Sequence, residues 1–325
     1  MISNRPIAPP VGQRLAGRKV AVSISLADDQ DRMGFAPDHM DHVLQSVLVP
    51  LVSEGAVIAY GGRIEHDHNY TLIISDQLGE AYRRMEQRPG HRPFVHFLAR
   101  HRFASESTPP ARLLTHLQAL APYGELWVTG RDGVLGAFAA DDRQQSTVAA
   151  CRSQGFPDGA AIEQTDGAEA LSAGQVYREI AAQAAPGANE SFTHMRMQMA
   201  QACDARVQVG GRSSGFSGPI SGLCEEALLT IAARRMLLVL GGFGGASRDI
   251  AIALGLLDPQ EAMPPQAAPD RGRYEAGLEQ LRAVRSELES MYAAETMQGL
   301  RELAGTESLV DAAQGLSRLL VEGLR

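Results

Sequence analysis

The charged residues best suited to chemistry lie between residues 191 and 229, where Arg196 precedes two adjacent acids, Glu225 and Glu226. An arginine can hold phosphate or ribose oxygens with a forked hydrogen bond. A carboxylate can stabilise the positive charge that builds on a sugar when a ribosyl C–N bond breaks, or it can activate water. Neighbouring residues on a helix differ in direction by about 100°, so we predict that Glu225 faces the ligand and that Glu226 is solvated or paired. If the protein is an enzyme, Arg196 and Glu225 are its predicted catalytic pair.

Pairs of glycines end three predicted strands, and glycine-rich turns let backbone N–H groups face an anion. The pairs lie in the sequences YGGR, VGGR and LGGFGG, and an arginine that could complement negative charge follows the first two. For each pair the alternative is a tight turn without a ligand, and for the serines of the first strand it is a hydroxyl satisfied within the strand. The predicted ligand-binding residues are Ser23, Ser25, Gly61, Gly62, Arg63, Gly210, Gly211, Arg212, Gly215, Ser217, Glu226, Gly241, Gly242 and Gly244.

Alternating strand and helix patterns must position these groups. Near-continuous apolar runs predict buried strands at 19–26, 56–62, 93–99, 125–130, 205–211 and 236–242. Helical patterns fall at 40–51, 70–84, 141–153, 170–184, 190–203, 221–234 and 246–254. This alternation predicts an α/β fold: a doubly wound, mainly parallel, Rossmann-like sheet with helices on both faces. In such sheets ligands bind outside the carboxyl ends of the strands.

The ends of the chain differ from this pattern. We predict an extended arm at 1–17, a nucleotide-binding domain at 18–256, a proline-rich linker at 257–272 and a helical C-terminal extension at 273–325. Tyr274, Leu281 and Leu288 fall seven residues apart in the extension. This stripe favours a helix packed on its own domain, and the alternative is an oligomer contact. The helical extension leads us to expect a homo-oligomer.

Composition excludes several classes of protein. The 325 residues are 44% hydrophobic and 21% charged, which is typical of a globular protein and not of a disordered one. A net charge of -8 argues against nucleic acid and anionic membranes as partners. No apolar run reaches the roughly 18 to 20 residues needed to cross a bilayer, and the first residues lack a secretory signal. Three cysteines without metal-like spacing fit a reducing compartment, so we expect a cytoplasmic protein.

The histidines offer the only candidate metal ligands. His66, Asp67 and His68 form one cluster, and His39 and His42 form another. Neither spacing comes with a convincing third ligand, so we predict no metal site and no cofactor.

The order of these motifs resembles a known family. HMRMQMAQACDARVQVGG followed by EE is similar to the signature of the "lonely guy" cytokinin-activating phosphoribohydrolases, and VSISL and VIAYGG are similar to that family's first strand and its glycine turn. The resemblance spans residues 18–256 and indicates the SLOG superfamily, a Rossmann-like group that also includes DNA-processing proteins and prokaryotic nucleotide sensors. It implies that Arg196 and Glu225 match the catalytic pair and that Gly210 and Gly211 match the phosphate-binding glycines.

The chain departs from the hydrolase pattern at several positions. Met197 replaces a lysine, Val209 replaces a proline, and the compact turn before the acids is expanded into RSSGFSGPISGLCEE. The expanded loop resembles that of prokaryotic SLOG proteins associated with defence and signalling. The departures therefore favour the superfamily over the specific enzyme.

The resemblance leads to one expected function and two alternatives. We expect a sensor or effector that binds a nucleotide-derived ligand, either ADP-ribose-like or a nucleotide sugar, in prokaryotic defence or signalling. The first alternative is a hydrolase of a nucleotide N-glycosidic bond that uses Arg196 and Glu225. The second is a DNA-associated protein, which the acidic composition disfavours.

Overall fold

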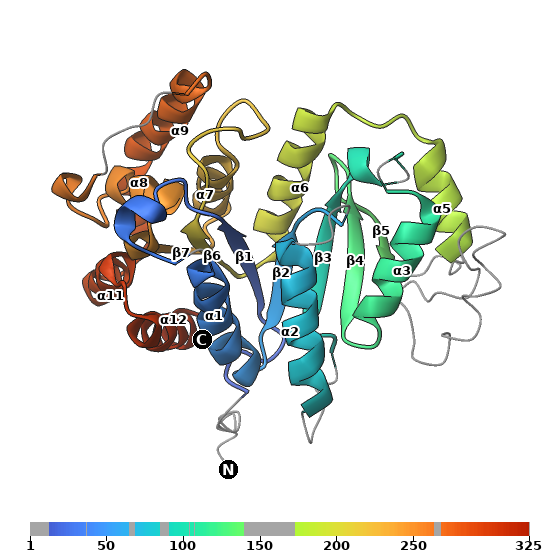
Figure 1. The fold of residues 1–325 in the computed structure, drawn as a ribbon, viewed down its shortest axis with the longest axis horizontal. Coiled ribbons are helices and arrows are strands. Elements are labelled where there is room, and N and C mark those ends of the chain that lie inside the picture. The colour runs from blue at the N-terminus through green and yellow to red at the C-terminus, as the bar shows by residue number, and fades with distance from the viewer. Residues whose placement is uncertain are drawn as a thin grey trace, which may run out of the picture.

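The fold is built around one seven-stranded sheet, in the strand order β5-β4-β3-β2-β1-β6-β7 (Figure 1). The computed structural model describes residues 13–36, 38–64, 69–84, 91–103, 105–106, 108–139, 173–262 and 268–324. Neighbouring strands are parallel except for β4 and β5, which are antiparallel. The strands are β1 (Lys19–Ser25), β2 (Val57–Gly61), β3 (Phe94–Ala99), β4 (Gly124–Thr129), β5 (Val134–Phe138), β6 (Ala205–Gly210) and β7 (Met236–Leu240).

Helices cover both faces of the sheet, as predicted. The helices that follow the first strands are α1 (His39–Ser53), α2 (Tyr70–Arg84) and α3 (Pro110–Leu120). The next are α5 (Ala173–Ala182), α6 (Ala188–Ala202), α7 (Gly222–Ala232) and α8 (Gly245–Ala253). The chain ends in α9 (Arg271–Ala283), α10 (Arg285–Met291), α11 (Ala294–Gly305) and α12 (Leu309–Gly323). The predicted doubly wound architecture is therefore confirmed.

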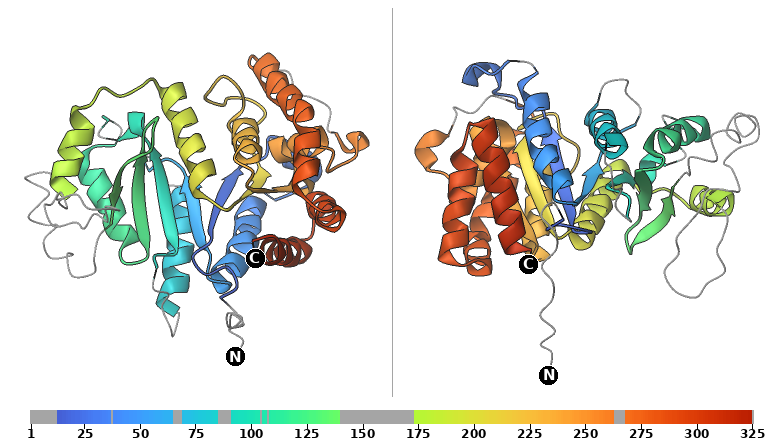
Figure 2. Two further views of the ribbon diagram at one scale, coloured as in Figure 1. Left: turned by 180° about the vertical axis from the view of Figure 1, so that it is seen from behind. Right: turned by 90° about the horizontal axis from the view of Figure 1, so that it is seen from below.

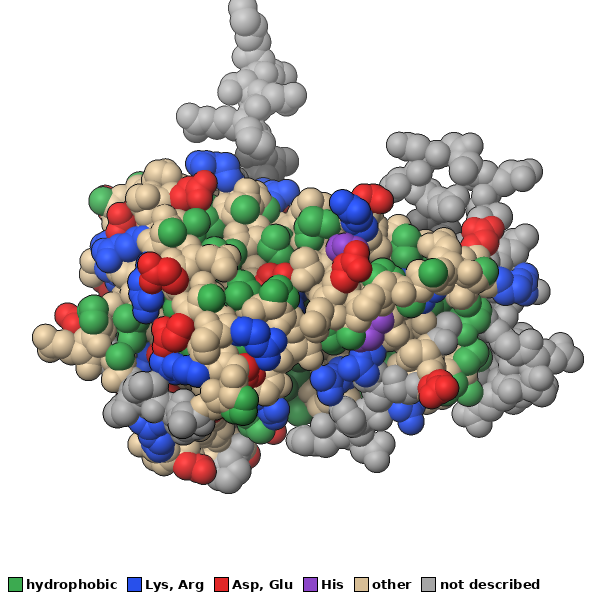
Figure 3. All heavy atoms as spheres, turned by 90° about the horizontal axis from the view of Figure 1, so that it is seen from above, with side chains coloured by type: hydrophobic (Ala, Val, Ile, Leu, Met, Phe, Trp, Pro, Cys, Tyr) green, Lys and Arg blue, Asp and Glu red, His purple; other side chains and the backbone are tan. Residues whose placement is uncertain are grey.

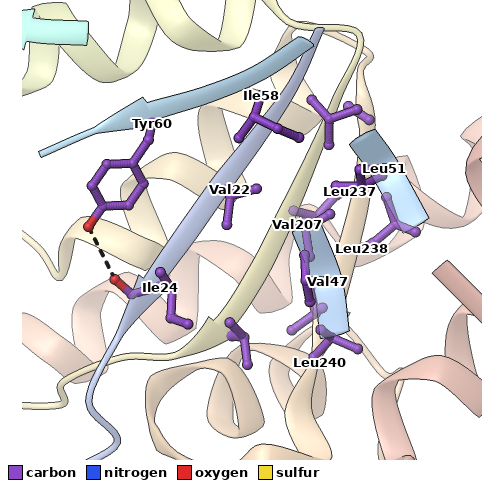
Figure 4. Close-up of a cluster of buried hydrophobic side chains, with 14 of the residues drawn as sticks. Val22, Ile24, Val47, Leu51, Ile58, Tyr60, Val207, Leu237, Leu238 and Leu240 are labelled. Carbon is purple, nitrogen blue, oxygen red and sulfur yellow. Dashed lines mark hydrogen bonds between the residues drawn. The ribbon is translucent and has the colours of Figure 1, made fainter. Parts of the chain in front are cut away.

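Side-chain direction along β6 shows which helices share a face. Successive residues of a strand point to opposite faces. Val207 lies in the same buried cluster as Val47 and Leu51 of α1, which Figure 4 shows from inside the core. Arg206 instead bonds to side chains of α7. Since Arg206 lies opposite Ala21 of β1, and Ala21 packs with methionines of α6, helices α6 and α7 cover the face opposite to α1.

The strand order creates a switch point between β1 and β6. From β1 the chain runs outward to β5, and it returns on the other side of β1 to form β6 and β7. The loops that leave the carboxyl ends of β1 and β6 therefore diverge from adjacent positions, which is where ligands bind in open α/β sheets. Figure 3 views the molecule from above, onto this edge, and acidic, basic and histidine side chains lie close together along its middle.

Two elements were missing from the sequence interpretation. Helix α3 begins at Pro110, and its buried residues Leu113, Leu117 and Leu120 lie at helical spacing, so the sequence carried a signal that the interpretation did not use. Strand β5 is a five-residue edge strand with a glycine at its centre and a half-exposed pattern, so it lacks the continuous apolar run of the buried strands. All six predicted strands are observed, and the predicted helix at 141–153 lies outside the described residues.

The C-terminal helices share the core of the sheet. Helix α11 contacts β7, α12 contacts α1, and α9 contacts α7 and α8. The right view of Figure 2, from below, shows the last helices lying against the sheet. Tyr274, Leu281 and Leu288 are buried within the chain. The stripe therefore packs on its own domain, and an oligomer would have to use another surface. Within the described residues no helix is both long and apolar enough to span a bilayer.

The close approach of the C-terminal helices to β7 predicts a sensitive glycine. A Cβ atom on Gly242 would lie 2.0 Å from the backbone oxygen of Thr306, between α11 and α12. We expect Gly242→Ala to lower the free energy of unfolding by about 1–3 kcal/mol, because the backbone must shift to accept the methyl group. The measurement is urea unfolding followed by circular dichroism.

Gly272 of α9 provides a matched control for that substitution. It is exposed, and an added Cβ atom would meet nothing within 4 Å. Gly272→Ala should leave stability unchanged or raise it by up to about 1 kcal/mol. Equal urea midpoints of unfolding for the two variants would show that Gly242 is not tightly packed against the C-terminal helices.

Candidate functional site

Arg196 and Glu225 meet in a buried ion pair between α6 and α7. Arg196 Nη1 donates to Glu225 Oε2, and Thr193 Oγ1 donates to the other carboxylate oxygen at 2.5 Å. Both members of the pair are 8% exposed. The two residues predicted to act together are therefore in contact. Thr193 was not predicted, although its position three residues before Arg196 places it on the same helical face.

The surroundings of Arg196 hold its guanidinium against the start of α7. The guanidinium carbon lies 5.5 Å from the centre of the Phe192 ring, one helical turn earlier. A Cβ atom on Gly222, the first residue of α7, would lie 2.6 Å from Arg196 Nη2. A larger residue at this position would require the guanidinium of Arg196 to shift. Sequence reasoning gave neither residue a role in the site, although Gly222 lies within the expanded loop RSSGFSGPISGLCEE.

Carboxylates of the chain hold the loop between β6 and α7. Asp28, in the loop after β1, accepts hydrogen bonds from the amide and hydroxyl of Ser213 at 2.6 and 2.9 Å. Asp270 accepts from the amide of Gly215 at 2.9 Å. Asp29 accepts from the amide of Gly245, at the start of α8, at 2.7 Å. Backbone amides of the kind that could face a phosphate are thus bonded to internal acids.

Close packing also involves the predicted glycines. A Cβ atom on Gly211 would lie 2.5 Å from Leu223, and one on Gly244 would lie 2.3 Å from Met33. A Cβ atom on Gly61 would lie 2.8 Å from Met195 of α6. Gly211 and Gly244 also have φ values of 96° and 81°, which favour glycine for a reason that needs no ligand. Gly241 and Gly242 pack against the C-terminal helices: a Cβ atom on Gly241 would lie 3.1 Å from the backbone oxygen of Ala304, and one on Gly242 would lie 2.0 Å from that of Thr306. That all three glycine pairs line one opening stays a prediction.

The exposed predicted residues lie around the end of β1. Arg63 and Arg212 are exposed after β2 and β6, the two neighbours of β1, and Gly215 and Ser217 are exposed in the loop that follows. Ser25 is half-buried, and its carbonyl accepts from the amide of Gly211 at 3.0 Å. The remaining predicted contacts, Ser23 and Glu226, are both bonded to Arg206.

A buried histidine pair supports the turn after β2. A carbonyl can only accept, so His96 donates from Nε2 to the oxygen of Gly62 at 3.1 Å. His96 Nδ1 lies within hydrogen-bond distance of His116 Nε2, at 2.9 Å. Burial, together with the neighbouring His96, holds the pKa of His116 well below its usual value of 6.5. The His116 ring is therefore neutral near pH 7, and sequence reasoning did not connect either histidine with the turn.

Two other features lie apart from this region. A surface groove of about 470 Å³ is lined by Arg14, Pro50 and residues of α12 such as Ser317 and Val321, at the opposite edge of the sheet. No group of three potential metal ligands occurs in the part of the chain that the structure describes, and His66, Asp67 and His68 lie outside it.

These features define a Rossmann-like α/β protein with a charged cluster at the switch point of its sheet. The chain matches the family model SLOG cluster2 over residues 14–123 and 143–313, and it belongs to that family. The match extends into the C-terminal helices. Neither the curated proteins nor the solved structures contain a match. Membership implies nucleotide-related binding in general terms and specifies no ligand.

The contacts of Asp28 predict a local change in loop stability. Asp28→Ala removes both bonds to Ser213, and bonds to a charged acceptor contribute about 1.5–3 kcal/mol each. We expect the amide of Ser213 to exchange with deuterium at least about tenfold faster. Asp31→Ala, at an exposed position of the same loop, is the control. Unchanged exchange in Asp28→Ala would mean that the carboxylate does not hold the loop.

The histidine pair predicts a pH dependence of stability. The folded-state pKa of His116 is lowered, so the unfolded chain takes up a proton that the folded chain excludes, and stability is lost as the pH falls through about 6.5. From pH 7.5 to 5.5 this loss is about 1.4 kcal/mol. Urea unfolding of the wild type and of His116→Gln at both pH values separates the contribution of His116 from that of other titrating groups. Equal pH dependence in the two proteins would contradict the assignment.

Proposed function

We propose that the protein binds a nucleotide-derived ligand at the carboxyl edge of the sheet, between β1 and β6, as a sensor or effector in prokaryotic defence or signalling. The ligand is ADP-ribose-like or a nucleotide sugar. The observation that carries the proposal is the buried contact of Arg196 with Glu225 at the switch point of the sheet. Membership of a SLOG family supports a nucleotide-related ligand.

The phosphates would contact exposed arginines at the edge. Arg63 and Arg212 flank the end of β1, and neither has a carboxylate partner among the described residues. A phosphate at the amide of Ser213 would have to displace the Asp28 carboxylate. Guanidinium groups bind phosphate in a forked geometry without such a displacement. We therefore assign the phosphate contacts to the two arginines rather than to the glycine turns.

The ribose would lie toward Arg196 and Glu225. A carboxylate accepts hydrogen bonds from vicinal hydroxyls, and a guanidinium donates to ring or phosphate oxygens. Glu225 and Arg196 each retain a small exposed fraction at this edge. The proposed site thus has two parts. The outer part, with the cations Arg63 and Arg212, would hold the phosphates, and the inner part, with the ion pair of Arg196 and Glu225, would hold the sugar.

Hydrolysis of an N-glycosidic bond is the second candidate function. The contact between Arg196 and Glu225 favours it, because a carboxylate held beside the anomeric carbon could stabilise an oxocarbenium-like transition state. Both functions use the same site and differ in whether the ligand is recovered intact. A homo-oligomer remains a prediction.

Ligand binding and cleavage can be measured together. Isothermal titration with ADP-ribose, NAD⁺, AMP and UDP-glucose should give binding for at least one, with matching thermal stabilisation. For that ligand, Arg63→Ala and Arg212→Ala should each weaken affinity by about fivefold to tenfold. The control is Arg301→Ala, which takes away an exposed positive charge of α11 and should leave affinity unchanged.

Chromatography of the incubated ligand separates the two functions. Intact ligand supports a sensor, whereas released base that disappears in Glu225→Gln supports the hydrolase. Failure of all four compounds to bind or to stabilise the protein would reject the proposal.

A further inference from the structure

We infer that Arg206 is a positioning residue, which engages Glu226 so that Arg196 stays with Glu225. Glu225 is then the one acid of the adjacent pair that meets a ligand, and Glu226 is an internal partner. The part of this inference that concerns a ligand rests on the proposed function. The part that concerns the side-chain contacts does not.

Arg206 is a charged residue inside the sheet. It lies in the middle of β6 and is 1% exposed, among the largest fully buried side chains of the protein. Its Nη1 donates to Glu226 Oε2 at 2.9 Å and to Ser23 Oγ at 2.7 Å. Its Nε donates to Thr230 Oγ1 at 3.0 Å. A buried guanidinium needs a carboxylate partner, and Glu226 is the one that it contacts.

The four charges form a chain from the sheet to its edge. Glu226 Oε2 faces Arg206, while its Oε1 lies 3.6 Å from Arg196 Nε. Arg196 in turn donates to Glu225, which also accepts from Thr193. Two positive and two negative groups therefore alternate in the order Arg206, Glu226, Arg196 and Glu225.

Removal of Arg206 would change the partner of Arg196. Among the described residues, Arg196 would then be the one remaining ion-pair partner of Glu226, and an uncompensated buried carboxylate is costly. The guanidinium of Arg196 would turn toward Glu226, and Glu225 would lose its cationic partner. Arg206 thus determines which of the two adjacent acids forms an ion pair with Arg196, although Arg206 is too deeply buried to touch a ligand.

The two acids provide the first test, because Glu→Gln conserves shape. Titration with the nucleotide that binds the wild type best should show that Glu226→Gln keeps affinity within about threefold, since Arg196 keeps Glu225. Glu225→Gln should weaken binding by more than about tenfold. Equal losses in the two variants would overturn the division of roles.

The second test uses charge rescue. Arg206→Met should weaken affinity by about tenfold or more, and Arg206→Met with Glu226→Gln should restore it to within about threefold, even if its melting temperature stays low. A merely structural role predicts no rescue of binding. Thr230→Val, which removes one bond of Arg206 but no charge, is the matched control and should bind as the wild type does.

A crystal structure decides the contacts without any ligand. In Arg206→Met we expect Arg196 to bond to Glu226 and not to Glu225, and an unchanged Arg196–Glu225 pair would overturn the inference. If the single variant does not fold, a structure of Glu226→Gln serves, in which the Arg196–Glu225 pair must persist. If the wild type binds no nucleotide, the proposed function fails while this test of Arg206 still stands.

Discussion

The structure depends on the cost of burying charge. Two guanidinium groups and two carboxylates lie between β6, α6 and α7, and each is less stable in the interior than in water unless an opposite charge contacts it. The three elements must therefore pack in one arrangement, in which Arg206 of the strand and Arg196 of α6 both face the first turns of α7. Gly222 allows this approach because it has no side chain. The same constraint places a polarised cluster at the point where β1 and β6 diverge.

A similar requirement explains the loops at this edge. Backbone amides that leave a strand need acceptors, and Asp28, Asp29 and Asp270 supply them from other parts of the chain. The expanded loop after β6 is thereby fastened to the loop after β1 and to the region before α9. In this family member, glycines and acids at the edge stabilise the fold as well as shape the candidate site, so a glycine-rich turn alone does not identify a phosphate contact.

Local patterns predicted most of the architecture. The buried strands were recognisable because both of their faces are covered, which makes their sequences continuously apolar. The positions Met40, Val43, Leu44 and Val47 lie at helical spacing and are all buried in α1, as their periodicity indicated. Strand β5 escaped detection because an edge strand with one exposed face has a weaker pattern. For the site, a motif resemblance named Arg196 and Glu225 but gave no role to Thr193, Phe192 or Arg206.

The sequence by itself determined which strands and helices follow one another along the chain, the superfamily, and the residue types available at the edge of the sheet. These follow from periodicity and motifs, which are properties of neighbouring residues. Only the tertiary structure decided that Arg196 bonds to Glu225, that Arg206 bonds to Glu226 and to Ser23, and that Asp28 holds Ser213. Arg206 and Ser23 are 183 residues apart, and their contact exists because β6 returns to lie beside β1. The order in which the strands lie side by side in the sheet depends on the packing of the whole core, and no local pattern of residues encodes it.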